Sequence, residues 1–271
     1  MHRFFAPSFD PGDETVALPR DEAEHLTRVL RIGVGDMVSV FDGRGHEFLA
    51  RVVSGAHRDV RVQLLSRIEP ARESSVSITL AQAVLKHDKM DDVVRDAVML
   101  GVAAIQPLVT KRTETTAAAL VRGARVDRWR RVALASAKQS RRAELPEIRT
   151  PLTIENYLTD PPPTLRLMLV EPMIGSGPST ALRAGESGEV RRPGPFGPGG
   201  DDVEPLSVLR GVPAPADVAL LVGPEGGWEE SEVAFASAAG VRLVSLGHRT
   251  LRADAVPVAA LSVLHFLWEQ P

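Results

Sequence analysis

The pattern of hydrophobic and polar positions divides the chain near residue 72. Before that point, short segments alternate apolar and polar residues, as half-buried strands do. These segments are 4–5, 16–18, 38–41, 48–53 and 60–65. Turn residues, Asp42-Gly43 and Gly45, separate two of them. With one helix expected over 21–30, residues 1–72 are predicted to form a small β-barrel with a helix.

After residue 72, continuous apolar runs alternate with segments of helical periodicity. The runs are 78–85, 104–109, 167–170, 218–222 and 241–246. Helices are expected over 89–100 and 126–144, and after each of the last two runs. This alternation is typical of an α/β domain with a parallel sheet, here 73–271. The Gly-, Pro- and Ser-rich stretch 175–205 is predicted to be a flexible insertion.

Two glycine loops follow the last two strands of the predicted sheet. The first has the sequence GPEGGW (223–228), and the second spans 247–253. Ligands of open parallel sheets bind beyond the carboxyl ends of the strands. The spacing is not G-x-G-x-x-G and no Walker lysine follows, so dinucleotide and P-loop sites are disfavoured. The acids Glu229, Glu230 and Glu232 would repel a pyrophosphate, so we expect a ligand with little phosphate. The alternative is a pair of ordinary strand-to-helix turns.

Composition narrows the class of protein. The 271 residues include no cysteine, which excludes disulfides and thiolate metal sites. The seven histidines lack ligand spacing, so no metal is expected. No apolar stretch approaches the ~18 residues of a membrane span. The N-terminus does not read as a signal peptide. We therefore expect a cytoplasmic protein without a membrane partner.

Basic residues concentrate in one segment of an otherwise slightly acidic chain. Between Lys111 and Arg149 there are 11 basic and four acidic residues, whereas the whole chain has a net charge of −3. On the helix expected over 126–144, Arg128, Arg131, Lys138 and Arg142 fall near one face. Such a stripe fits a phosphate backbone. A solvated basic face is the alternative from charge alone.

A series of longer motifs occurs in order along nearly the whole chain, with 175–205 as the exception. They are HRFF (2–5), HLTRVLR (25–31), VFDGRG (40–45), LAQAVLKHDKMD (80–91), LGVAAIQPLVTKR (100–112), RW (128–129), AKQSRRAELPEI (137–148), GPEGGW (223–228) and SLGHRTLRAD (245–254). Together they resemble the RsmE family of 16S rRNA uridine-N3 methyltransferases, in the SPOUT superfamily. Two departures from the family are Met99, where a Glu is usual, and Ala253-Asp254-Ala255, where the family has Thr-Glu-Thr.

The resemblance implies a fold, a cofactor and partners. The fold would be an N-terminal PUA-like β-barrel that binds RNA, followed by a C-terminal SPOUT methyltransferase domain with a trefoil knot. The cofactor would be S-adenosylmethionine (SAM). The substrate would be 16S rRNA or the small ribosomal subunit, and the protein would be a homodimer. Two alternatives stay open: a SPOUT methyltransferase on another RNA such as tRNA, and a non-catalytic RNA-binding ribosome-assembly protein.

Site residues follow from the same motifs. Uridine N3 is protonated and must lose its proton, so a base or a cation that stabilises the uridinate is useful. Arg252 is the candidate cation and Glu225 the candidate base. The alternative for Glu225 is a structural role, in which it caps backbone amides of its own loop. Asp254 is expected to cap the last helix, Glu232 to be structural, and Glu171 to lie near the pocket. The cofactor would lie against Val222, Gly223, Pro224, Gly226, Gly227, Leu246, Gly247 and Leu251. The RNA would contact Arg28, Arg31, Arg112, Arg128, Lys138, Gln139 and Arg142.

Overall fold

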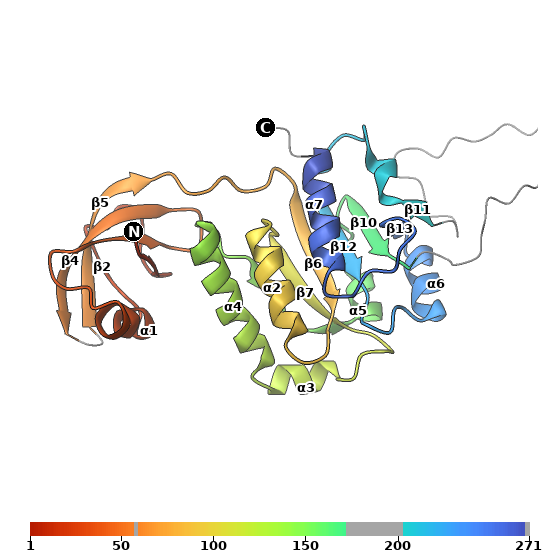
Figure 1. Cartoon of the computed structure of the whole chain (residues 1–271), viewed down its shortest axis with the longest axis horizontal. Coiled ribbons are helices and arrows are strands. Elements are labelled where there is room, and N and C mark those ends of the chain that lie inside the picture. The colour runs from red at the N-terminus through yellow and green to blue at the C-terminus, as the bar shows by residue number, and fades with distance from the viewer. Residues whose placement is uncertain (57–58, 172–202, 269–271) are drawn as a thin grey trace, which may run out of the picture. The chain divides into compact units, whose positions relative to one another are not determined.

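The structure is a computed structural model that describes residues 1–56, 59–171 and 203–268 (Figure 1). The chain forms two compact units. The first comprises Met1–Glu73 and Arg130–Glu147, and the second comprises Ser74–Trp129 and the chain from Ile148 onward. The chain thus changes unit after Glu73, and residues 130–147 group with the N-terminal unit. The sequence pattern alone does not indicate that regrouping.

The first unit is built on a five-stranded sheet with the order β1-β3-β4-β5-β2. Its strands are β1 (Arg3–Phe5), β2 (Thr15–Ala17), β3 (Met37–Phe41), β4 (Glu47–Ala56) and β5 (Asp59–Ile68). A short α1 (Arg20–Glu24) runs directly into the π-helix η1 (His25–Val29). Alternation decides the faces of β5, where Val60 and Val62 are buried and Arg61 and Gln63 are exposed. The buried positions of all five strands meet in one core with Leu26 of η1.

Arg3 explains why 130–147 belong to the first unit. Its guanidinium binds the Glu47 carboxylate at 2.8 and 2.9 Å. It also donates to the backbone carbonyls of Ala137, Lys138 and Arg142, at 2.7–3.1 Å. The HRFF motif therefore fixes the end of a helix that lies far away in sequence. A buried guanidinium needs this many acceptors, because a charge removed from water without them is costly.

The second unit contains a parallel sheet with the order β11-β13-β10-β12-β6-β7-β8, and β9 also pairs with β7. Its strands are β6 (Ser77–Ala83), β7 (Ala104–Val109), β8 (Glu147–Ile148), β9 (Leu152–Thr153), β10 (Leu165–Leu169), β11 (Glu204–Pro205), β12 (Asp217–Val222) and β13 (Arg242–Ser245). Its helical elements are α2 (Lys89–Met99), α3 (Ala117–Arg122), the start of α4 (Arg125–Ser140), α5 (Ile154–Thr159), η2 (Leu206–Leu209), α6 (Glu230–Ala238) and α7 (Val256–Trp268).

Helices cover both faces of this sheet. In Figure 1, α2 and α7 lie side by side on one face, and the two helices pack together. On the other face, α5 and α6 pack together over Ala81, Met168 and Leu221. Strands covered on both sides should be apolar throughout, and β10 and β12 are almost entirely buried.

The last strand is interleaved with earlier chain. β13 pairs with β10 on one side and with β11 on the other, although both precede it in sequence. In the sheet, β13 therefore lies between two strands that precede it in sequence, before the chain continues into α7.

Most predicted elements are confirmed, and the differences lie at helix ends. The strand expected over 104–109 has these bounds, and Gly240 follows α6 with a φ of +77°, as a helix-ending glycine does. The last helix begins at Val256, so Asp254 is not its N-cap and that prediction is wrong. The basic helix ends at Ser140 instead of 144.

Two further expectations concern the insertion and membrane-spanning helices. The insertion predicted near 175–205 lies outside them, except for its last three residues. None of the helices in the described ranges combines the length and the apolar character that a membrane span needs.

Candidate active site

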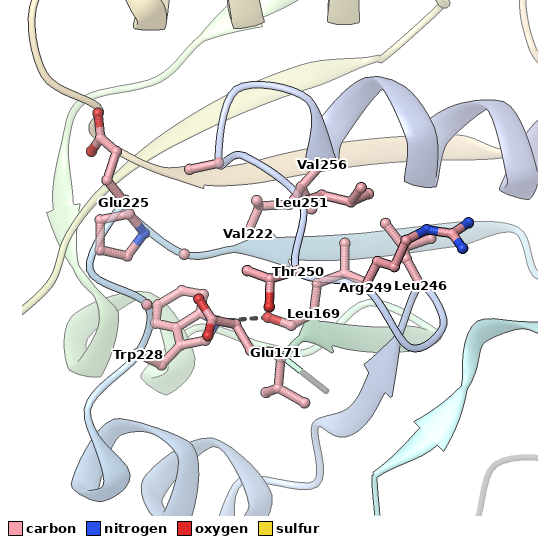
Figure 2. A pocket seen from close by; sticks show the side chains of 15 residues that line it. Leu169, Glu171, Val222, Glu225, Trp228, Leu246, Arg249, Thr250, Leu251 and Val256 are labelled. Carbon is pink, nitrogen blue, oxygen red and sulfur yellow. Dashed lines mark hydrogen bonds between the residues drawn. The ribbon is translucent and has the colours of Figure 1, made fainter. Parts of the chain in front are cut away.

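The second unit holds a pocket beyond the carboxyl ends of β10, β12 and β13 (Figure 2). It encloses about 590 Å³, counting the part that is open to solvent. Three segments line it, one after each strand. The lining residues are Leu169, Val170 and Glu171; Val222, Gly223, Pro224, Glu225, Gly227 and Trp228; and Leu246, Arg249, Thr250, Leu251, Ala253 and Val256.

Trp228 fixes the first glycine loop to the end of β10. Its indole Nε1 donates to the Leu169 carbonyl at 2.8 Å (Figure 2). The indole lies so close to Gly223 that a Cβ there would be 3.1 Å from Nε1. Gly227 turns the loop with a φ of +69°, and its N–H donates to the Pro224 carbonyl. The glycines are therefore required by close packing and by backbone conformation.

The pocket gathers six of the eight positions predicted to hold a cofactor: Val222, Gly223, Pro224, Gly227, Leu246 and Leu251. Gly226 and Gly247 are not among its lining residues. The carbonyl of Gly226 accepts a 2.6 Å bond from Arg112, and Gly247 makes a turn with a φ of +106°. Glu171 lines the pocket as expected.

Sequence reasoning missed seven lining residues: Leu169, Val170, Trp228, Arg249, Thr250, Ala253 and Val256. The tryptophan that ends the GPEGGW motif was a usable signal, because a large side chain beside three glycines has to pack on the loop. Leu169 and Val170 lie at the end of a strand that the sequence predicts, but only the arrangement of the strands shows that this end meets the two loops. The other four lie in or directly after the second loop, and sequence does not show which of its side chains turn inward.

Glu225 is bound by cations and N–H groups on the far side of its loop. Its Oε1 accepts from Lys89 Nζ at 3.0 Å and from the Lys86 N–H at 3.1 Å. Burial opposes ionisation of this carboxyl, but bonds from its own N–H, Lys89 and Lys86 outweigh burial and lower the pKa of Glu225. A carboxylate with a lowered pKa is a weaker base. The geometry thus favours the loop-anchoring alternative for Glu225 over the general base.

Arg252 lies between two lining residues, Leu251 and Ala253, and its side chain is 74% exposed. Its guanidinium makes two bonds to the Asp254 carboxylate, at 2.9 and 3.1 Å. Burial opposes ionisation of Asp254, but the bond from Arg252, a backbone bond and the charges of Arg252 and Lys89 lower its pKa. Asp254 therefore holds Arg252 in place and does not cap the last helix.

Glu232 is structural, as predicted. It is buried, and its two oxygens accept from the N–H groups of Glu229 and Lys111, at 2.9 and 2.8 Å. The first bond belongs to a capping box that begins α6. The second ties the segment after β7 to this helix. Arg112 follows in that segment and binds the first glycine loop through Gly226.

The predicted RNA contacts differ in accessibility. In the first unit, Arg28, Arg31 and Gln139 are exposed, and Lys138 is ion-paired with Glu22. In the second unit, Arg112 is exposed, and Arg128 is ion-paired with Asp88 and Asp91 at 3.0 and 2.5 Å.

The prediction that Arg142 contacts RNA is wrong. Its side chain is only 6% exposed and binds the Glu73 carboxylate at 2.6 Å. Helical periodicity placed it on the basic stripe, but the helix ends at Ser140 and the chain then turns inward. Arg142 is therefore not a surface contact for RNA.

No metal cluster accompanies the pocket in the part of the chain that the structure describes: no group of three or more His, Cys, Asp or Glu side chains is placed to hold an ion.

Comparisons with known proteins match the whole chain. A family model described as RNA methyltransferase domain matches residues 72–190 and 199–265, and one described as RNA methyltransferase PUA domain matches 18–65. The ribosomal RNA small subunit methyltransferase E of Synechocystis sp. is 32% identical over 95% of this chain and 75% of its own length.

Two solved structures resemble the chain over nearly its full length. One is the ribosomal RNA small subunit methyltransferase E of Neisseria gonorrhoeae bound to S-adenosylmethionine. It has a TM-score of 0.76 and 29% identity, and the match covers 99% of this chain and 98% of that one. The other is a putative methyltransferase of Legionella pneumophila in complex with SAM, with a TM-score of 0.76, 28% identity, and coverage of 97% and 96%.

Proposed function

The chain belongs to the RsmE family of RNA methyltransferases, and from this premise we propose that it methylates N3 of a uridine in 16S rRNA. It is a SAM-dependent enzyme with a PUA-like N-terminal unit and a SPOUT methyltransferase unit. One observation carries the proposal. The motifs GPEGGW (223–228) and SLGHRTLRAD (245–254), which follow two different strands and have α6 between them, form two walls of a single pocket at the ends of three strands.

The pocket fits SAM in chemistry and in shape. Val222, Leu246 and Leu251 supply an apolar wall for the adenine. Gly223 lets Trp228 pack directly on the loop that forms one wall, because a Cβ there would lie 3.1 Å from the indole Nε1. Glu171 adds a carboxylate beside Gly227, suited to the hydroxyl and ammonium groups of the cofactor. When bound, SAM supplies an electrophilic methyl group on a sulfonium.

Arg252 is the residue that we assign to the acceptor base. The uridine must lose its N3 proton, and negative charge then spreads over the uracil oxygens. A guanidinium held at the rim of the pocket stabilises that charge as it develops. Asp254 keeps the guanidinium oriented through two bonds. Neither Glu225 nor Asp254 is a strong base, since the pKa of each is lowered. The proposal therefore assigns catalysis to charge stabilisation, with the proton leaving to solvent.

In each unit, exposed cations are candidates for RNA contacts, together with one exposed amide in the first unit. We propose Arg28, Arg31 and Gln139 in the first unit and Arg112 in the second, because all four are exposed. Arg128 and Lys138 also contact the RNA in this proposal, once phosphates of the RNA replace the carboxylates with which they are paired. Such contacts are strongly salt-dependent. An rRNA substrate places the enzyme in the cytoplasm, where ribosomes assemble.

The homodimer is also a proposal, and α7 supports it. From Val256 to Trp268 this helix has no Asp, Glu, Lys or Arg. Phe266 on the helix is nevertheless 81% exposed, and Met99 at the end of the adjacent α2 is also exposed. Exposed apolar side chains on an uncharged helix are typical of a protein interface.

Transfer of a labelled methyl group tests the function. The purified protein is incubated with labelled SAM and, separately, small ribosomal subunits, naked 16S rRNA and tRNA. The nucleosides are then analysed by mass spectrometry. We expect 3-methyluridine in small-subunit RNA. Label in tRNA alone would favour a different RNA substrate, and SAM binding without transfer to any of the RNAs would favour a non-catalytic role.

A further inference from the structure

Lys89 occupies a position that helix stability does not explain. It is the first residue of α2, and the same turn contains Asp91 and Asp92. The N-terminus of a helix carries partial positive charge, so acids are favoured there and a cation is disfavoured. The side chain is only 35% exposed, so it is not simply solvated.

The side chain of Lys89 contacts Glu225, a residue that lines the pocket. The Lys89 ammonium binds Glu225 Oε1 at 3.0 Å, and the Lys86 N–H donates to the same oxygen. The Glu225 side chain is 21% exposed, which limits screening of the pair by water. The segment between β6 and α2 thereby holds the first glycine loop at Glu225, while Trp228 holds the loop at its other end.

Lys89 also acts on the second loop. Its positive charge is one of the causes that lower the pKa of Asp254, after the opposing effect of burial and the stronger influence of Arg252. Asp254 in turn orients Arg252 through two hydrogen bonds. One ammonium therefore lies near the acids of both loops.

We propose that Lys89 is a positioning residue for methyl transfer: it holds the first glycine loop, one wall of the pocket, in place by binding Glu225. The effect on transfer rests on the proposed function. The effect on the pocket does not, because SAM binding can be measured without RNA.

The pH dependence of SAM binding depends on the charged groups that surround Glu225 and Asp254. Glu225 faces Lys89 and the Lys86 N–H, and the Lys86 ammonium, which pairs with Glu114, lies near it as well. Asp254 faces Arg252 and Lys89. Removing Lys89 removes a cation common to both sets.

The test measures SAM affinity by calorimetry for the wild type, Lys89→Met and Lys89→Arg. Arg95→Met is the matched control, since Arg95 lies on the same helix and pairs only locally with Asp92 and Asp96. We expect Lys89→Met to weaken SAM binding about tenfold, as loss of a partly buried charge-assisted bond does. Lys89→Arg should stay within about threefold of the wild type, because it keeps the charge. The control should be unchanged.

A pH series separates positioning from a merely structural role. Glu225 is ionised above its lowered pKa, so wild-type SAM affinity should fall only as the pH drops through that value. Without Lys89 the pKa of Glu225 rises, and the fall should begin at higher pH. Lys89→Arg should restore the wild-type profile.

A double-mutant cycle completes the test. If Lys89 acts through Glu225, the loss in Lys89→Met and the loss in Glu225→Gln should not add in the double variant. Wild-type affinity and an unchanged pH profile in Lys89→Met would overturn the inference, and so would additive losses. A wild type that binds SAM but methylates no small subunit would instead contradict the proposed function, and the binding comparison would still decide the role of Lys89.

Discussion

Arg252 and Glu225 have opposite charges and lie in different loops, and their side chains differ in burial and in binding partners. Glu225 is partly buried and held by Lys89 and Lys86, which makes it part of the wall. Arg252 is mostly exposed and held by a single acid two residues away. A residue that must face a bound base needs this accessibility, because its charge acts only when the substrate is present.

Replacing Arg252 by Ala should separate binding from transfer. Loss of a preorganised charge at the transition state costs roughly 10²–10³ in kcat. We therefore expect methylation to fall by that factor in Arg252→Ala, with SAM affinity little changed. Single-turnover transfer and calorimetry measure the two quantities. Arg95→Ala is the matched control, because Arg95 lies on α2 outside the two loops and pairs locally with Asp92 and Asp96. Collapse of SAM binding in Arg252→Ala would make Arg252 a cofactor or structural residue.

Asp42 gives the VFDGRG motif its structure. Its buried carboxylate accepts from the backbone N–H and side chain of both Arg44 and His46, at 2.7–3.1 Å. Burial opposes ionisation, but these four bonds outweigh it and lower the pKa of Asp42 below its ordinary 3.8. Because the native-state pKa is lowered, the stabilisation is present above pH 3.8 and is lost as the pH falls through the lower value.

Asp42→Asn should therefore be destabilising in a pH-dependent way. We expect a loss of about 1–3 kcal/mol in the free energy of unfolding at neutral pH, since a buried charged acceptor is replaced by an amide. The difference from the wild type should shrink at a pH well below 3.8. Urea denaturation at both pH values measures it. A difference of equal size at both would show that the charge of Asp42 contributes nothing.

At the residue level, sequence could predict which loops form the pocket but not which side chains are paired. Glycines mark the loops because they permit a positive φ, as at Gly227. The pairing of Glu225 with Lys89 joins residues 136 positions apart. No local pattern contains it, because it depends on how β6 and β12 lie next to each other.

Among the elements, the start of α6 connects the first glycine loop to the segment that follows β7. The capping box of Glu229 and Glu232 begins the helix, and Glu232 also accepts from the Lys111 N–H after β7. The same segment carries Arg112 onto the glycine loop through the Gly226 carbonyl. The start of one helix thus holds two segments of the pocket rim.

Glu232→Ala should show this double role. Loss of the cap and of a buried acceptor is expected to cost about 1–3 kcal/mol in the free energy of unfolding. The matched control is Glu230→Ala, in the same turn but exposed, where we expect a change within about 0.5 kcal/mol. Chemical denaturation measures both. Equal effects of the two substitutions would refute the assignment.

Periodicity predicted the elements well where packing and propensity agree. β7 lies between covered faces and reads as an apolar run bounded by turns, so its bounds were predictable. The basic helix was predicted too long because helical periodicity continues to Arg142, whereas that side chain turns in to Glu73. The grouping of 130–147 with the first unit depends on Arg3, whose bonds span more than 130 positions. Sequence spacing cannot show such bonds.

At the scale of the whole molecule, we expect two copies of the chain to associate through α7. Its uncharged sequence and the exposure of Phe266 leave an apolar surface that water covers poorly. Phe266→Glu should convert a dimer into a monomer, measured by light scattering after size exclusion. Phe235→Glu is the control, because Phe235 is exposed on α6, a helix of the other face. A monomeric wild type, or a dimeric Phe266→Glu variant, would contradict the interface.

The most direct measurement of the central claim compares 16S rRNA from cells with and without this gene by nucleoside mass spectrometry. Complementation uses the wild type and Arg252→Ala. The account predicts that one 3-methyluridine is lost without the gene, returns with the wild type, and stays absent or strongly reduced with Arg252→Ala. An unchanged 3-methyluridine signal in the absence of the gene would contradict it.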